Sequence, residues 1–163
     1  MGSIRAWRLA AVMAIVGLFG MCPWGSASPS VAWGTYMGGA SSEDAYGVAV
    51  DSQGNIYIAG ATTTSGAPWV GGGWDETLDG SGDAFAVKLS PLGAHRWSGY
   101  GGSTAGTTRA ARVRACGNGT LLMTGRTQTG GWITGGWDNT HNGGADGFLL
   151  QVRDVVAVPG ITG

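Results

Sequence analysis

The chain has 163 residues, of which 33 are glycine and only 12% are charged. Ordinary domains have about 7% glycine and about 25% charged residues, and a mostly helical fold is disfavoured because each glycine inside a helix costs about 1 kcal/mol. The glycines follow no Gly-X-Y period, which excludes collagen, and 43% hydrophobic residues is too many for a disordered chain. The composition therefore indicates short β-strands joined by glycine turns.

Residues 1–27 have the layout of a secretory signal peptide. Two arginines precede an apolar run over residues 9–24, and small residues follow at Gly25–Ala27. The run is shorter than the roughly 20 residues that a membrane-spanning helix needs. We therefore expect cleavage after Ala27 and export to the medium, the periplasm or the cell surface, with no membrane span in the mature chain.

Removal of these residues changes the charge and the cysteine count. Loss of Arg5 and Arg8 leaves seven basic and ten acidic side chains, a net charge near −3, and no run of basic residues remains. Nucleic-acid binding is therefore disfavoured. Cys116 becomes the only cysteine, which excludes an internal disulfide. We expect Cys116 to be a small buried hydrophobe, with a reactive or intermolecular thiol as the alternative.

The mature chain is a tandem duplication with an offset of 63 to 65 residues. Its six tryptophans form three matched pairs: Trp33 with Trp97, Trp69 with Trp132, and Trp74 with Trp137. Other segments follow the same register: Gly54–Thr62 matches Gly119–Thr127, and Gly82–Val87 matches Ala145–Leu150. The pattern predicts one repeat unit over residues 28–93, a second over 94–157, and a tail at 158–163.

Each unit predicts four short strands, because apolar residues alternate between glycine turns. Alternation places Val48 with Val50, Ile56 with Ile58, and Phe85 with Val87 and Leu89 on shared faces. The strands are expected at residues 31–37, 46–51, 55–61 and 84–89, and at 96–101, 111–116, 120–126 and 147–153. Hairpin turns at 51–55 and 116–119 place glycine where a positive φ costs little.

Four antiparallel strands repeated in tandem are the unit of a β-propeller blade, so the expected fold class is all-β. The chain also resembles the bacterial beta-propeller repeat family (SBBP-type repeats). In the first unit the resemblance is carried by Trp33 with Tyr36–Gly39, by DAYGVAVDSQGNIYIAGAT at residues 44–62, and by GDAFAVKLSPLG at 82–93. In the second unit Cys116 stands where the first has Asp51.

The resemblance implies an exported or cell-surface propeller that binds partners or acts as a scaffold, and it brings no defined catalytic residues. Propellers typically close with about four to eight blades. Two blades therefore predict an incomplete propeller, a ring closed by oligomerisation, or a fragment of a longer propeller. Expected partners are other blades or a second copy, or a protein or glycan ligand.

Tryptophans in glycine-rich loops carry the candidate ligand site. They could stack on sugar rings or contact a protein, or they could fill the seams between blades. The candidate ligand-binding residues are Trp69, Trp74, Asp75, Trp132, Trp137 and Asp138. Trp33 and Trp97 lie in predicted strands, where we expect core packing.

The other polar residues suggest turn chemistry rather than catalysis. Asp51, Asp83 and Asp146 are expected to cap turns. His95 and His141 have no second ligand at metal spacing, so we expect no metal. The sequence has no Gly-x-Ser-x-Gly elbow and no Walker-type phosphate loop, so we also expect no cofactor and no catalytic residue. The first hypothesis is an exported, non-enzymatic structural or protein-interaction module. The alternative is a lectin-like propeller assembled from several two-blade chains, and a third is an enzyme subunit whose active site requires further blades.

Overall fold

The computed structural model describes residues 28–117 and 119–154, so the predicted signal peptide and the tail at 158–163 lie outside it. The described residues form seven strands: β1 (Glu43–Val50), β2 (Ile56–Thr62), β3 (Asp83–Leu89), β4 (His95–Gly101), β5 (Thr108–Ala115), β6 (Thr120–Thr127) and β7 (Asp146–Arg153). Among them no helix is long and apolar enough to cross a membrane. The all-β prediction is confirmed.

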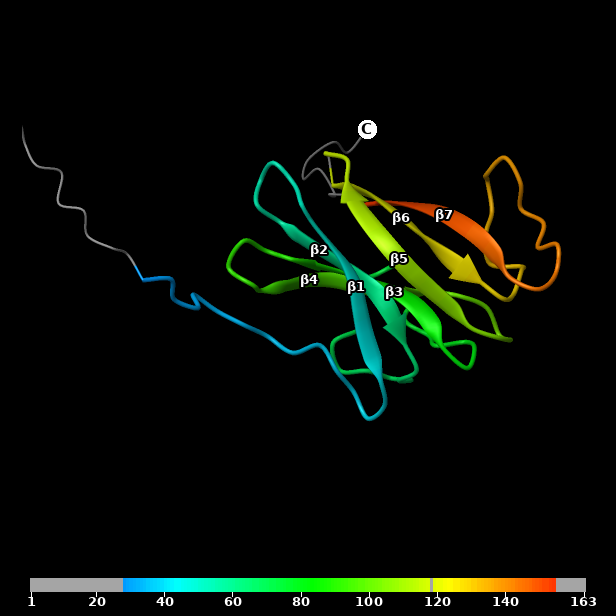
Figure 1. Ribbon diagram of the computed structural model, residues 1–163, viewed down its shortest axis with the longest axis horizontal. Helices are drawn as coiled ribbons and strands as arrows, with labels where there is room; N and C mark the ends of the chain where they lie inside the picture. The colour runs from blue at the N-terminus through cyan, green and yellow to red at the C-terminus, as the bar shows by residue number, and fades with distance from the viewer. Residues whose placement is uncertain (1–27, 118, 155–163) are drawn as a thin grey trace, which may run out of the picture. The chain divides into compact units, whose positions relative to one another are not determined.

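The strands form two antiparallel sheets, ordered β1-β2-β3-β4 and β5-β6-β7 (Figure 1). In each sheet every strand pairs with its neighbour in the sequence. The long connection over residues 62–82, predicted between the third and fourth strands of the first unit, joins β2 to β3. Neither sheet closes on itself. The fold class is thus that of incomplete propeller blades.

The sheets are offset from the sequence repeats. β4 opens the second unit of the sequence but pairs with β3, where Tyr100 lies opposite Phe85. Its counterpart in the first unit, residues 31–37, was expected to be a strand and is not one. That prediction is wrong because a strand needs backbone partners on a neighbouring edge, and the edge of β3 is already occupied by β4. The unit boundary at residues 93 and 94 stays a prediction.

Both sheets have a β-bulge at the same repeat position. The register shifts between Ala45 and Gly47 on β1, and between Ala110 and Arg112 on β5. A Cβ atom at Gly60, opposite the first bulge, would lie 1.9 Å from the carbonyl oxygen of Asp44. The bulge thus brings the neighbouring backbone so close that only glycine fits.

The core lies in two clusters. One lies between the sheets, since β1, β2 and β3 contact β5; its buried members are Tyr57, Ala59, Ala84, Ala86, Trp97, Ala110, Leu121, Met123 and Phe148. The other lies on the opposite face of the first sheet and contains Phe85, Val87, Leu89 and Tyr100. The predicted shared face of Phe85, Val87 and Leu89 is confirmed.

Two burial predictions are wrong. Trp97 is buried in β4 as expected, but Trp33 is 44% exposed, because it lies outside any strand and no sheet covers it. Cys116 is exposed rather than buried. It follows the end of β5 in the turn to β6, where its N–H donates to the carbonyl oxygen of Thr120 at 2.8 Å. Alternate side chains are buried only within the strand, and Cys116 lies after the end of β5, so its side chain is not directed into the core.

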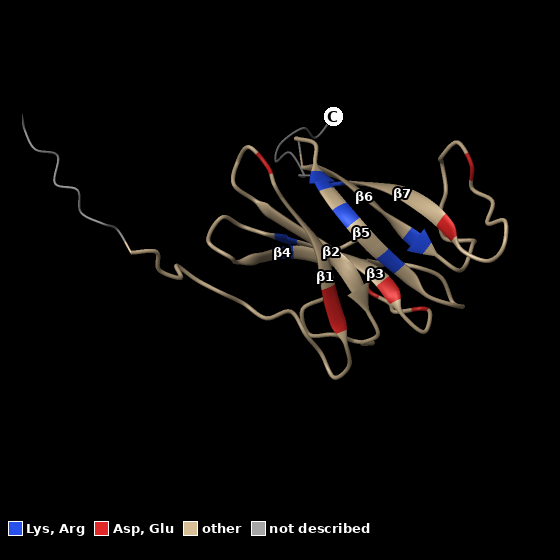
Figure 2. Ribbon diagram, viewed as in Figure 1, with Lys and Arg blue, Asp and Glu red and all other residues tan. Residues whose placement is uncertain are grey.

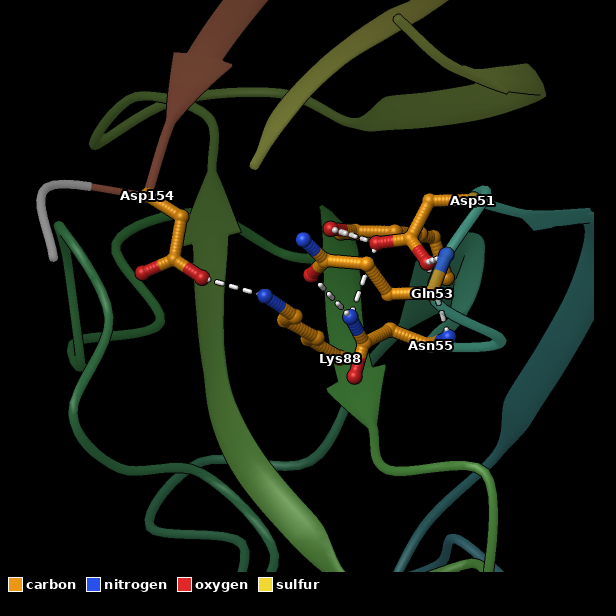
Figure 3. A network of polar contacts seen from close by, with 6 residues as sticks. Asp51, Gln53, Asn55, Lys88 and Asp154 are labelled. Atoms are coloured by element: carbon orange, nitrogen blue, oxygen red, sulfur yellow. Dashed lines mark hydrogen bonds and ion pairs between the residues drawn. The ribbon is translucent and has the colours of Figure 1, made fainter. Parts of the chain in front are cut away.

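A polar network joins the two sheets (Figure 3). Lys88 on β3 forms an ion pair with Asp154, which follows β7. The ammonium also lies 5.4 Å from the ring centroid of Tyr57, whose hydroxyl donates to Asp51 at 3.1 Å. Burial by itself would lower the pKa of Lys88, but the hydrogen bond to Asp154 contributes to a net increase in that pKa. Lys88 therefore stays charged although it is almost fully buried.

Candidate functional site

The tryptophans of the first long loop pack onto the first sheet. The ring of Trp69 meets Phe85 edge-on at a centroid distance of 5.1 Å and Tyr100 at 6.1 Å. Trp74 packs edge-on against Trp97 at 5.9 Å and remains 41% exposed. Trp69 therefore packs on the face that carries Phe85 and Tyr100, and Trp74 packs beside Trp97 of the opposite face.

The matching loop of the second unit is more open. Trp132 meets Phe148 edge-on at 5.1 Å, which repeats the Trp69–Phe85 contact. Trp137, the counterpart of Trp74, is 102% exposed. A pocket of about 690 Å³ lies between this loop and β7. Its lining includes Trp132, Trp137, Asp138, His141, Phe148 and Leu149. The structure thus brings three of the six candidate ligand residues together in one pocket.

The paired aspartates cap turns. Asp75 accepts from the N–H of Thr77 at 2.9 Å, and Asp138 accepts from the N–H of Thr140 at 2.8 Å. These are Asx turns, in which a side chain satisfies the backbone two residues later. Asp51 does the same, because one oxygen accepts from the N–H groups of Gln53 and Asn55 at 2.9 Å each. The capping prediction is confirmed for Asp51.

Asp83 and Asp146 cap corresponding turns but differ in burial. Asp83 accepts from the N–H of Asp79 at 3.0 Å, and Asp146 from the N–H of Asn142 at 2.8 Å. Asp83 is fully buried, and burial raises its pKa. It is covered by the chain after β4, since a Cβ at Gly102 would lie 2.0 Å from Asp83 Oδ1. Asp146, on the open side of the second sheet, is only half-buried.

Glu43 holds the segment that precedes β1. One carboxylate oxygen accepts from the hydroxyls of Thr62, at 3.0 Å, and Thr64, and the other accepts from the N–H of Gly39 at 3.0 Å. Burial by itself would raise the pKa of Glu43, but these hydrogen bonds outweigh it and lower that pKa. The carboxylate form therefore stabilises the fold.

This contribution should depend on pH. A carboxyl whose pKa is lowered by folding stabilises the protein above its unfolded pKa, about 4.3 for Glu, and this stabilisation is lost as the pH falls through the folded value. We expect Glu43→Gln to lower the thermal unfolding midpoint near neutral pH, and the difference from the native chain to shrink toward about pH 3. Unfolding midpoints measured across this range check it. A difference that is independent of pH would contradict it.

Five arginines share the outer face of the second sheet: Arg109, Arg112, Arg114, Arg126 and Arg153. Figure 2 shows basic residues along β5 and at the end of β6. Arg109 lies directly opposite Arg126, a repulsive cross-strand pair. In the described part of the chain none of the five forms an ion pair. The sequence contains no consecutive run of basic residues here, because Arg112 and Arg114 alternate along one strand. The pairing of β5, β6 and β7 brings the other three arginines onto the same face.

An apolar stripe, Val48 and Val50, lies exposed on β1. These side chains are 68% and 61% exposed and lie opposite Ile58 and Ile56. Their repeat counterparts, Val113 and Ala115, pack against the cluster between the sheets. The same face of the repeat is therefore covered in the second sheet and uncovered in the first.

The histidines lie apart. His95 Nε2 is 2.9 Å from the hydroxyl of Ser98, and His141 lines the pocket beside Trp137. Over the described residues, His, Cys, Asp and Glu side chains form no group of three that could hold a metal ion.

Residues 32–66, which include Trp33, β1 and β2, match the family model described as SBBP, beta-propeller repeat. No curated protein matches the chain. The matched segment contains the bulge and the Asp51 turn that the fold builds around β1 and β2. Residues 32–66 therefore match a beta-propeller repeat, and the two open antiparallel sheets are consistent with incomplete propeller blades.

Proposed function

We propose that the chain is an exported, non-enzymatic propeller module that contacts a protein partner through its apolar stripe. The exposure of Val48 and Val50 carries this proposal, because their counterparts Val113 and Ala115 are packed. Adjacent exposed apolar residues in one sheet face mark an interaction surface more often than isolated ones do. The leader-like residues 1–27 support export.

The carboxylates support a role in binding rather than in catalysis. Asp51, Asp75 and Asp138 use their side-chain oxygens to cap their own turns. Glu43 accepts three hydrogen bonds, and Asp154 pairs with Lys88. Side chains engaged in this way are occupied with structure and are poorly placed to transfer protons.

Site-specific photo-cross-linking tests the surface. A photoreactive phenylalanine analogue is placed at Val48 or Val50 in the full chain, produced in its own organism. We expect discrete cross-linked adducts from both positions, because a partner that covers the stripe lies in van der Waals contact with it. Leu92 is the control, since it is an apolar residue in the turn between β3 and β4 that is even more exposed, at 87%, than Val48 and Val50. Yields from Val48 and Val50 no higher than from Leu92 would contradict the proposal.

A second candidate function is carbohydrate binding in the second loop. The exposed indole of Trp137 beside Asp138 in a pocket of about 690 Å³ favours it, because sugars stack on exposed aromatic rings. Tryptophan fluorescence titrated with the sugars that bind on a glycan array tests this candidate. Saturable changes that Trp137→Ala abolishes would support it, and no response to any sugar would exclude it.

A further inference from the structure

We propose that a second copy of this chain donates residues 33–37 as the fourth strand of the second sheet, alongside β7. This inference rests on the proposed interaction module and names its partner. In the first sheet the corresponding edge, on β3, is occupied by β4. In the described residues the outer edge of β7 carries no strand. By the repeat, the segment that matches β4 is the one containing Trp33 and Tyr36.

The aromatic contacts show what is missing at that edge. The edge-on pair of tryptophan and phenylalanine has a 5.1 Å centroid distance in both units. In the first unit Tyr100 completes the cluster; it is 0% exposed, and its hydroxyl donates to the carbonyl oxygen of Thr64 at 2.9 Å. In the second unit the matching place is the pocket lined by Thr129, the counterpart of Thr64. Tyr36, the counterpart of Tyr100, is 101% exposed and free to fill it.

A second aromatic pair is unmatched in the same way. Trp97 of β4 packs against Trp74 at 5.9 Å. Their counterparts are Trp33, which lies in no strand, and Trp137, which is fully exposed. A donated segment that follows the register of β4 would bring Trp33 of one copy to Trp137 of the next. Exposed aromatics from both partners would then be buried together.

The backbone of β7 can accept such a strand. In β4 the N–H groups of Ser98 and Tyr100 donate outward, to Gly71 and Asp75. Backbone groups of successive residues alternate sides in an antiparallel pair, so Trp97 and Gly99 face β3, at Lys88 and Ala86. The β7 counterparts of Lys88 and Ala86 are Gln151 and Leu149. Their backbone groups face the open edge and would pair with Trp33 and Thr35 of the donor.

Donation replaces contacts that the segment makes within its own chain. Trp33 lies against the β3–β4 turn, since a Cβ at Gly93 would be 3.2 Å from its ring. This contact leaves Trp33 44% exposed. Pairing with β7 supplies backbone hydrogen bonds and a pocket for Tyr36 in exchange. A glycine pair follows the tyrosine in both segments, directly as Gly101–Gly102 after Tyr100 and one residue later, after Met37, as Gly38–Gly39. In the first sheet glycine at position 102 lets the chain pass over the buried Asp83.

The apolar stripe provides a second contact in the same assembly. Only residues 38–42 separate the donated segment from β1. The donor's first sheet therefore lies beside the acceptor's second sheet. If it packs through Val48 and Val50 as the second sheet packs through Val113 and Ala115, it covers the outer face of the second sheet. That face carries Leu122 and Leu149 together with the arginines, whose apolar stems can cover Val48 and Val50 while their charged ends stay in water. Strand donation thus explains why the stripe is uncovered in one copy.

Register-specific disulfide trapping tests the proposal. Two full chains are made, each with Cys22 and Cys116 replaced by serine, one carrying Gly34→Cys and the other Leu150→Cys. These positions match Ser98 and Val87, which lie opposite each other without mutual hydrogen bonds, where cross-strand Cβ atoms come closest. On refolding the two chains together and oxidising them mildly, we expect a covalent heterodimer.

The matched control replaces Leu150→Cys by Val152→Cys, two residues along the same face of β7. We expect at least tenfold less heterodimer from the control pair, and a similar loss when Tyr36→Asp is added to the Gly34→Cys chain. Equal yields of heterodimer from both cysteine pairs would overturn strand donation. No heterodimer from either pair would overturn it as well, and this is the result expected if residues after Asp154 of the same chain cover β7. Photo-cross-linked adducts at Val48 and Val50 without the disulfide would leave the interaction module standing and exclude this partner.

Discussion

Gly60→Ala and Gly125→Ala should each lower the free energy of unfolding by about 3 kcal/mol or more, the upper range for overpacking a closely packed site. A Cβ at Gly60 would lie 1.9 Å from the carbonyl oxygen of Asp44 and 2.8 Å from Phe85 Cζ. At Gly125 it would lie 2.0 Å from the carbonyl oxygen of Arg109. Both contacts arise from the bulge on the adjacent strand, so relief of the clash requires the bulge itself to move. Urea denaturation at one fixed protein concentration measures the effect.

Gly71→Ala is the matched control. No atom lies within 4 Å of a Cβ at Gly71, and its φ is not in the left-handed region. We therefore expect a change within about 0.5 kcal/mol. If Gly60→Ala and Gly125→Ala were as stable as Gly71→Ala, the shared bulge would not be a constraint on the repeat.

Asp154→Ala should destabilise the chain by about 3 kcal/mol, because it leaves the Lys88 ammonium buried without its carboxylate. The pair joins β3 of the first sheet to the end of the second, so its loss also loosens the contact between sheets. The double variant Lys88→Met with Asp154→Ala removes the buried charge and should regain most of the loss. Urea denaturation of the two variants and the native chain gives their free energies of unfolding. The comparison separates the destabilisation caused by an unpaired buried cation from the net stabilisation that the ion pair provides.

An exposed carboxylate serves as the control for that comparison. Asp44 is exposed, and among the described residues its carboxylate accepts only from the hydroxyl of Tyr46, at 3.1 Å. Asp44→Ala should change stability by no more than about 0.5 kcal/mol. Equal costs for Asp44→Ala and Asp154→Ala would show that Lys88 reaches water in the folded chain and that the ion pair does not join the sheets.

Much of the fold follows from local pattern. Alternation of Ile56 with Ile58 and of Phe85 with Val87 is enough to place β2 and β3 within one or two residues of their observed bounds. The tandem match of the tryptophans predicts two similar sheets. Glycine and aspartate at residues 51–55 predict a turn because their side-chain and backbone preferences act over only a few residues.

What the sequence leaves out is pairing between distant segments. The repeat register does not say whether the strand of Trp97 joins the sheet before it or the one after it, so its place beside β3 and the unpaired state of Trp33 appear only in the structure. The arginine face arises from the register of β5 on β6, and the Lys88–Asp154 pair joins residues far apart in the chain. Similarly, the pocket at Trp132 and Trp137 exists because the second sheet has three strands among the described residues.

The two sheets, the open edge of β7 and the uncovered stripe support a single account, in which the chain is a pair of blades completed by its neighbours. Light scattering coupled to size exclusion, on the chain without residues 1–27, tests this account most directly. The account predicts one discrete species of two to four chains, since about four to eight blades close a ring. It also predicts that Tyr36→Asp converts this species to monomer. A native chain that is folded and monomeric at tens of micromolar would contradict it.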